Sequence, residues 1–381
     1  SIYYALHCMF QSQCEDKGST YFNPDPNSAE SLVNKDTKKS DTYVELEFHG
    51  DGTIYKYSKV GYAETPKKTT SVVRDLNGEC VFINHKFLFN VFSFRNSQYI
   101  DLFPVFIKDI LPFVLTSDKS EFISQIYDDV MKGIKRHGKS NKIEDSYKNR
   151  IEKFNKETYR VIYNLINQEA DTIYNNYFRN EEERNLRITL EYADNHDNVP
   201  QPNMSYWLRC GYRFQSVTKA GIKEENKISR TVEVLQPSII LKVEEQMADN
   251  SFQLIEKPQT YFNEAKLTAV ALSIRFALLD TVGAANGRFL ALDDMLISLD
   301  MSNRMKVIYY LLNVVVKNYK LYVFTHDRLF YHTFKRIIET QYTKSEWLFG
   351  GLYSNDLEEP IRPIFKPEAT TNIKDIHDAY E

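Results

Sequence analysis

The segment between residues 288 and 327 constrains the fold of this chain more than any other. It contains two short apolar runs that end in polar residues, Asp293-Asp294 after the first and Thr325-His326-Asp327 after the second. Residues 303–316, between the two runs, have apolar residues at helical spacing. A strand, a helix and a second strand in this order predict a βαβ unit, and therefore a parallel sheet in an α/β fold. Such sheets bind ligands at the edge where their strands end.

A second pattern predicts β structure nearer the start of the chain. From residue 42 apolar and polar residues alternate, and the turn His49–Gly52 separates two such stretches, which predicts a β-hairpin. This strand-rich region is expected to continue through Val72–Val73 and Cys80–Ile83. The apolar run Tyr99–Leu115 predicts short helical pieces, because prolines interrupt it. A helix is expected at residues 1–13, and further strands at residues 186–192, 206–214 and 238–244.

Residues 118–186 form a charged, proline-free segment with apolar residues at helical spacing. A break at His137–Asn141 divides the segment, so it predicts a helical hairpin whose second helix has roughly 40 residues and a length of about 60 Å. Between Lys132 and Lys156 there are nine Lys and Arg residues and three acidic ones. Either these basic residues contact a phosphate backbone, or they form a solvated helix face.

The composition excludes several classes of protein. With 381 residues, of which 42% are apolar and 26% charged, the chain is expected to be globular and to form one large domain or two ordinary ones. The net charge of −4 argues against uniform binding along nucleic acid. We expect no membrane span, because no apolar run reaches about 18 residues. The cysteines lack metal-ligand spacing, which predicts reduced thiols in a cytoplasmic protein; they are Cys8, Cys14, Cys80 and Cys210.

The residues after Asp294 change the interpretation of the acidic pair. An acidic pair such as Asp293-Asp294, taken alone, has two ordinary explanations: it is the end of a buried strand, or it is the N-cap of a helix. Here Ser298-Leu299-Asp300 follows, and the second strand ends in Thr325-His326. This order resembles the Walker B motif, D-loop and H-loop of ABC-type ATPases of the RecF/SMC kind, which are P-loop NTPases. The resemblance implies that Asp293 binds Mg²⁺, that Asp294 is the general base, and that His326 contacts the γ-phosphate of ATP.

The segment before a helix predicted at residues 269–279 extends the resemblance. Phe262-Asn263-Glu264-Ala265-Lys266 is similar to the LSGGQ signature, which binds the γ-phosphate held by the opposite subunit. In this alignment Asn263 matches the serine, Ala265 the second glycine and Lys266 the glutamine, whereas Glu264 departs from the first glycine. The alternative is that Asn263 only caps the helix.

The start of the chain resembles the helix that follows a Walker A loop in this family. Ser1-Ile2-Tyr3-Tyr4-Ala5-Leu6 places Ser1 near the Mg²⁺-binding serine, so we expect a chain truncated after Walker A that binds ATP poorly by itself. Gly138-Lys139-Ser140 lacks the other glycines and the preceding apolar strand, so it is not such a loop. Asn84 or His85 stands where the Q-loop glutamine is expected, and a buried strand end is the alternative.

The resemblance implies an ABC-ATPase head with a mixed sheet, an antiparallel β lobe and a helical-hairpin arm. Its N-terminal lobe would comprise residues 1–117, the coiled-coil arm residues 118–186 and the C-terminal lobe residues 187–381. Because the signature acts across the interface between two heads, a homodimer around two ATP molecules is implied, with Ser298 and Asp300 of the D-loop at the interface. ATP and Mg²⁺ are the expected cofactors.

Two roles are open for an ATPase of this kind. The first is DNA repair and maintenance or anti-phage defence, in which the protein acts on DNA. The second is a regulatory ATPase whose nucleotide cycle gates a partner effector, such as a nuclease or toxin, without contacting DNA. A transporter ATPase is a distant third, because the arm differs from the compact helical subdomain of transporters. Salt-dependent DNA binding would favour the first role, and ATP-controlled release of a partner the second.

Overall fold

The computed structural model of the chain contains two units. The first comprises residues 1–12, 16–69 and 324–381, and the second comprises residues 13–15 and 70–323. Within these units the structure describes residues 2–13, 17–25, 28, 31–33, 42–48, 52–67, 72–77, 80–84, 99–137, 145–194, 208–219, 222–279, 288–295, 299, 301–342, 346–354 and 363–368.

The first unit contains an antiparallel sheet with the strand order β1-β2-β3. These strands are β1 (Tyr43–Glu47), β2 (Ile54–Ser58) and β3 (Gly61–Thr65). The β-hairpin predicted from the alternating pattern is therefore present. Tyr55 and Tyr57 lie on one face of β2 and are fully buried, so this face forms a core. Two helices also belong to this unit: α1 (Ile2–Gln11), where the sequence predicts a helix, and α2 (Gly18–Tyr21).

The first unit also contains α12 (Arg328–Gln341) and an antiparallel hairpin of β12 (Gly350–Ser354) and β13 (Pro363–Pro367). Lys335 of α12 forms an ion pair with Glu368, which directly follows β13. This ion pair connects the helix to the hairpin.

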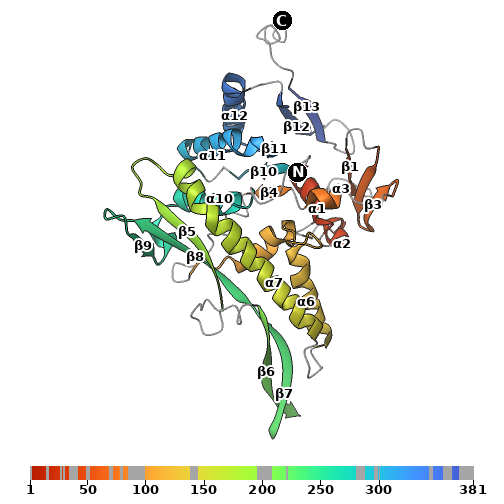
Figure 1. Ribbon diagram of the computed structural model, residues 1–381. Helices are drawn as coiled ribbons and strands as arrows, with labels where there is room; N and C mark the ends of the chain where they lie inside the picture. Colours follow the sequence, from red (N-terminus) through yellow and green to blue (C-terminus); the bar gives the residue numbers. More distant parts are fainter. Residues whose placement is uncertain are drawn as a thin grey trace. The chain divides into compact units, whose positions relative to one another are not determined.

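The second unit contains the sheet that carries the acidic pair (Figure 1). β4 (Val81–Asn84), β10 (Phe289–Asp293) and β11 (Lys320–Phe324) lie in the order β11-β10-β4, and β10 is parallel to β4. Helix α11 (Met301–Asn313) connects β10 to β11 along the chain. Strand β10 is buried from Phe289 to Leu292, which explains its continuous apolar run.

One strand prediction is wrong. Val72–Val73 belongs to a helix, α3 (Val72–Asn77). Val73 and Asn77 are four positions apart and both fully buried, so they share the inner face of this helix. Two adjacent β-branched residues favour a strand locally, and here the packing of one helical face outweighs that preference.

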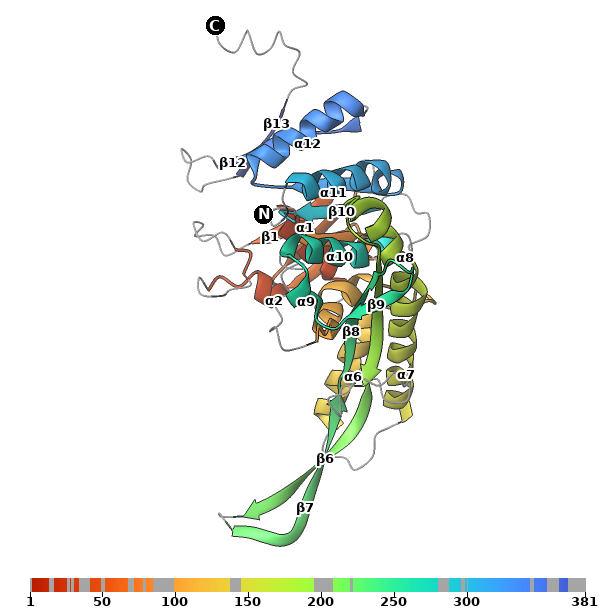
Figure 2. The ribbon, with the colours of Figure 1, turned by 90° about the vertical axis from the view of Figure 1, so that its left-hand side faces the viewer.

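The arm begins with two helices, α6 (Ile123–His137) and α7 (Asp145–Tyr159), which lie side by side in both views (Figures 1 and 2). Gly133 allows them to approach closely, because a Cβ at this position would lie 1.9 Å from Cε1 of Tyr147.

The second helix of the arm continues beyond α7 and includes two π-helical segments, which widen the helix locally. Its further parts are η3 (Arg160–Ile166), α8 (Asn167–Ile173) and η4 (Tyr174–Phe178). The helix ends at Phe178 and is shorter than predicted, because residues 179–185 form a loop that leads to β5.

Asparagine side chains attach this helix to β5 (Leu186–Asp194). Asn167 donates from Nδ2 to the carbonyl oxygen of Leu190 at 2.9 Å and accepts from the Leu190 N–H at 2.8 Å. Asn175 makes the same two bonds with Leu186, at 2.7 and 2.9 Å. The spacing matches, since residues 167 to 175 span about 12 Å of helix and residues 186 to 190 about 13 Å of strand.

The remaining strands of the second unit form two antiparallel sheets. β5 pairs with β8 (Pro237–Gln246), and β8 pairs with β9 (Phe252–Ile255). The other sheet is a two-stranded ribbon of β6 (Arg209–Lys219) and β7 (Ile222–Leu235), seen clearly in Figure 2. Among the described residues of the whole chain, no helix has the length and apolar character needed to cross a membrane.

Candidate functional site

The acidic pair lies at the carboxyl end of β10. Asp293 is the last residue of this buried strand, and Asp294 follows with a φ of +50°. Only a few per cent of residues other than glycine adopt this left-handed conformation, and the backbone turns sharply there. Helix α11 begins only at Met301, so neither aspartate is its N-cap. The helix-cap interpretation of the pair is therefore wrong.

Asn84 lies beside Asp293. Strands β4 and β10 are parallel, and Asp293 is opposite Asn84 in their register. Both residues therefore stand at the same edge of the sheet, where parallel sheets bind ligands. Of the two Q-loop candidates, Asn84 is half-buried at this edge, whereas His85 lies outside the described residues. Ser1, Ser298 and Asp300 also lie outside them.

The signature-like segment begins helix α10 (Glu264–Phe276). Asn263 is its N-cap, since Oδ1 accepts a hydrogen bond from the Lys266 N–H at 2.8 Å. Asn263 therefore caps the helix, and the N-terminus of α10 is exposed at Asn263 and Glu264. Every residue of the helix from Leu267 to Phe276 is buried.

Two acidic residues act on the N-terminal turn of α10. Glu264 is exposed at its first position, where a carboxylate complements the helix dipole but repels an anionic ligand. Glu183, in the loop that ends the arm, has Oε2 3.8 Å from Nζ of Lys266. The same ammonium group lies 4.4 Å from the centre of the Phe262 ring. Lys266 is thus held between a carboxylate and an aromatic face.

His326 belongs to the first unit. It is exposed and follows β11, in the order the sequence predicts. The next residue, Asp327, caps α12, because its Oδ1 accepts from the Phe330 N–H at 3.1 Å. The Asp327 N–H donates in turn to Oγ1 of Thr325 at 3.1 Å. These bonds define the short turn that presents His326.

Arg275 is a residue of this region that sequence reasoning missed. It lies within the apolar helix α10 and is 1% exposed. Its Nη2 donates to the carbonyl oxygen of Phe82 in β4 at 3.5 Å. The helix with the signature-like residues is thereby linked to the strand that ends at Asn84. Arg275 is the one charged residue between Leu267 and Phe276, and this was the available signal, since a buried cation needs a partner.

The donor set at Asp293 is compatible with Mg²⁺. Mg²⁺ prefers oxygen ligands and is commonly held by one or two carboxylates together with the phosphates of the substrate. Asp293 provides a carboxylate and its neighbour Asn84 an amide oxygen. Within the described ranges no three His, Cys, Asp or Glu side chains converge as a complete metal site.

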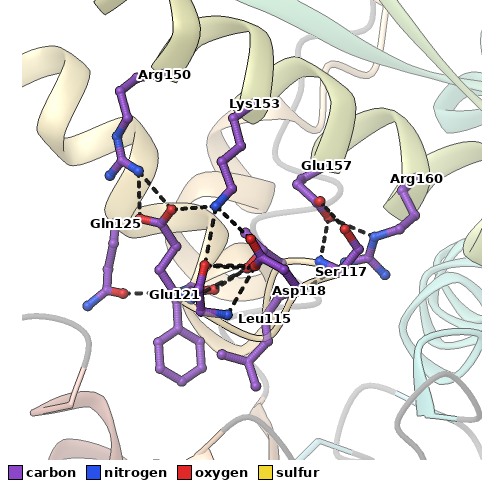
Figure 3. Close-up of polar contacts among 12 residues, drawn as sticks. Leu115, Ser117, Asp118, Glu121, Gln125, Arg150, Lys153, Glu157 and Arg160 are labelled. Atoms are coloured by element: carbon purple, nitrogen blue, oxygen red, sulfur yellow. Dashed lines mark hydrogen bonds and ion pairs between the residues drawn. The ribbon is translucent and has the colours of Figure 1, made fainter. Parts of the chain in front are cut away.

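Two of the basic residues of the arm are neutralised within the chain (Figure 3). Arg150 pairs with Glu121 at 2.7 Å and also with Asp129, and Lys153 pairs with Glu121 at 2.8 Å and Asp118 at 3.1 Å. These contacts hold α7 against the segment before α6. They also reduce the positive charge that the arm offers to a phosphate backbone.

No protein-family model and no curated protein matches the chain. Its structure is similar to the Smc head domain of Pyrococcus furiosus with an extended coiled coil, bound to the C-terminal domain of ScpA, at 11% identity and a TM-score of 0.37, covering 87% of this chain and 75% of that one. It is also similar to the recombination mediator protein RecF with ATPrS, at 13% identity and a TM-score of 0.33, covering 75% of this chain and 73% of that one. Similarities at these TM-scores do not assign the chain to a family.

Proposed function

We propose that the chain is an ATP-binding and hydrolysing head of the ABC type, of the RecF/SMC kind. The single observation that supports this most is the edge formed by Asp293 and Asn84, with Asp294 in a left-handed turn directly after the strand. Open α/β sheets bind their ligands at this position. The signature-like start of α10 in the same unit supports the same assignment.

In this proposal each residue has a distinct task. Asp293 would hold Mg²⁺, aided by Asn84, and the bound cation would neutralise charge on the phosphates. Asp294 accepts the proton of the attacking water, and His326 steadies the γ-phosphate. The signature-like segment faces the phosphate of a second head through Asn263, Glu264, Ala265 and Lys266. The D-loop residues Ser298 and Asp300 are assigned to the interface between the two heads. The active unit is then a homodimer closed around two ATP molecules.

The regulatory role has one observation in its favour. Arg150 and Lys153 belong to the basic set of the arm, and their charges are compensated by Asp118, Glu121 and Asp129. This observation favours an ATPase that gates a partner effector over an ATPase whose arm binds DNA. The roles in DNA maintenance and in defence by acting on DNA predict binding to a duplex that weakens steeply with salt, and fluorescence anisotropy across a salt series tests them.

The proposal is tested by ATP-dependent dimerisation and hydrolysis, measured by light scattering and phosphate release. The protein is used with any residues that precede Ser1 in its natural sequence, because the proposal requires a phosphate-binding loop. We expect Asp294→Asn to lower the hydrolysis rate by about 10²- to 10⁴-fold, the usual contribution of a general base, and to trap the ATP-bound dimer.

Asp249→Asn is the matched control, since Asp249 is an exposed turn residue to which the proposal gives no role. We expect this variant to behave as the wild type does. A wild-type protein without any response to ATP contradicts the proposal. An Asp294→Asn variant that hydrolyses ATP at the wild-type rate contradicts the role of Asp294.

A further inference from the structure

Lys266 stands where electrostatics disfavour a lysine. Asn263 is the N-cap of α10, so Lys266 is the third residue of the first helical turn. A cation there opposes the helix dipole, and this is the position at which capping boxes carry Glu or Gln. Its side chain is nevertheless mostly buried, with 13% exposed. The helix itself disfavours this lysine, whose ammonium group is held by the Phe262 ring and by Glu183 of the arm.

Glu183 is held in place by the end of the arm. Its carboxylate accepts hydrogen bonds from the Tyr174 hydroxyl at 3.2 Å and from Nδ2 of Asn180 at 3.0 Å, and its N–H donates to the Asn180 carbonyl oxygen at 3.0 Å. Partial burial raises the pKa of Glu183, but the bonds from Asn180 and the charge of Lys266 outweigh it and lower the pKa. The carboxylate is therefore charged at neutral pH.

The same loop also contacts the helix that follows the acidic pair. Nζ of Lys306, on α11, donates to the carbonyl oxygen of Phe178 at 3.1 Å and to Asn180. Tyr310 of α11 packs against Phe178 with ring centres 5.5 Å apart. The end of the arm is thus attached firmly to α11, whereas its contact with Lys266 is a single long ion pair of 3.8 Å.

We propose that Glu183 competes with the phosphate of ATP for Lys266. The inference rests on the proposed function, in which the start of α10 faces a triphosphate bound to a second head. Without nucleotide, Glu183 neutralises Lys266. When a triphosphate arrives, the more highly charged phosphate replaces the carboxylate, and Lys266 becomes a phosphate ligand. Glu183 is then an autoinhibitory residue, and the arm that carries it controls the dimerisation of the heads.

The competition predicts the sign of a mutational effect. Glu183→Gln retains hydrogen-bonding capacity towards Tyr174 and Asn180 but removes the charge that holds Lys266. We expect this variant to form the ATP-dependent dimer at a several-fold lower protein concentration than the wild type. Lys266→Gln should weaken the dimer, and the double variant should match Lys266→Gln. Dimer formation is measured by light scattering with Mg-ATP and with ADP, on the same full chain.

Glu182→Gln is the matched control, because Glu182 is exposed in the same loop. Thermal unfolding of each variant establishes that it is folded. If folded Glu183→Gln dimerises more weakly than the wild type, Glu183 only stabilises the structure and the inference is wrong. If Lys266→Gln dimerises normally, the inference is also wrong, while the proposed function stands. A wild-type protein that does not respond to ATP overturns the proposed function first, and this inference with it.

Discussion

At the scale of single residues, Asn263 has two roles that mutation can separate. It caps α10 through its side-chain oxygen, and in the proposed function its side chain and the free N–H groups beside it face a phosphate. Alanine removes both contributions of the side chain. Aspartate keeps the cap but places a negative charge towards the ligand, so it isolates the second role.

We expect Asn263→Ala to lower the free energy of unfolding by about 1 kcal/mol, the typical loss of an N-cap. Asn263→Asp should be as stable as the wild type and should fail to form the ATP-dependent dimer, because its carboxylate repels phosphate. Urea denaturation gives the first result and light scattering the second. Normal dimerisation of Asn263→Asp would show that Asn263 does not face the nucleotide.

Part of the site was predictable at this scale. The acidic pair and the cap at Asn263 follow from local patterns: a strand that ends in carboxylates, and a polar residue before a helix. The pairing of Glu183 with Lys266 was not predictable, because it joins a loop to a distant helix and depends on how the arm packs. The fold places them together through Tyr174, Asn180 and Lys306.

At the scale of elements, the asparagine bonds fix the arm helix to β5. Asn167 satisfies both backbone groups of Leu190, and Asn175 both groups of Leu186. No periodic signal in the sequence marks these asparagines. The strands β1, β2 and β10, in contrast, were predictable because alternation or a short apolar run is a direct consequence of which faces are buried.

We expect Asn167→Ala to lower the free energy of unfolding by about 1–3 kcal/mol for each backbone group that it leaves without a partner. Asn176→Ala is the matched control, since Asn176 is exposed on the same helix and should have little effect. Urea denaturation measures both, and hydrogen exchange at Leu190 should accelerate only in the first variant. Equal stability of the two variants would contradict the importance of these bonds.

At the scale of the whole molecule, acid should loosen the attachment of the arm. Partial burial raises the pKa of Glu121, but the hydrogen bonds and charges of Lys153 and Arg150 outweigh it, so the pKa is lowered. For Glu157 the bonds from Ser117 and Arg160 outweigh burial in the same way, and lower its pKa as well. A carboxylate with a lowered pKa stabilises the fold above its unfolded pKa of about 4.3 and loses that contribution as the pH falls further.

We therefore expect the free energy of unfolding to fall as the pH drops below about 4.3, through the window between the unfolded and the lowered pKa values. Glu121→Gln should make this fall less steep. Glu152→Gln, an exposed change on α7, should leave it as it is. Urea denaturation across a pH series measures the slopes. Identical slopes for Glu121→Gln and the wild type would contradict a role for these ion pairs.

The division into two units limits what the sequence alone predicts about the candidate site. Asp293, Asn84 and the start of α10 belong to the second unit, whereas His326 belongs to the first. Sequence order predicts the motifs within each unit, because each depends on local strand and helix ends. Contacts between residues far apart in the chain depend on long-range packing, for which a single sequence carries no local signal.

The asparagine bonds of the arm helix have a further consequence, for association between copies. Among the described strands, β5 lies at the edge of its sheet, and an uncovered edge strand can pair with a strand of another molecule. At Leu186 and Leu190 that backbone is already bonded to Asn175 and Asn167. The two asparagine side chains thus make the backbone hydrogen bonds that a neighbouring strand would otherwise make. Neither fibril growth nor strand exchange can use these positions until the helix is detached.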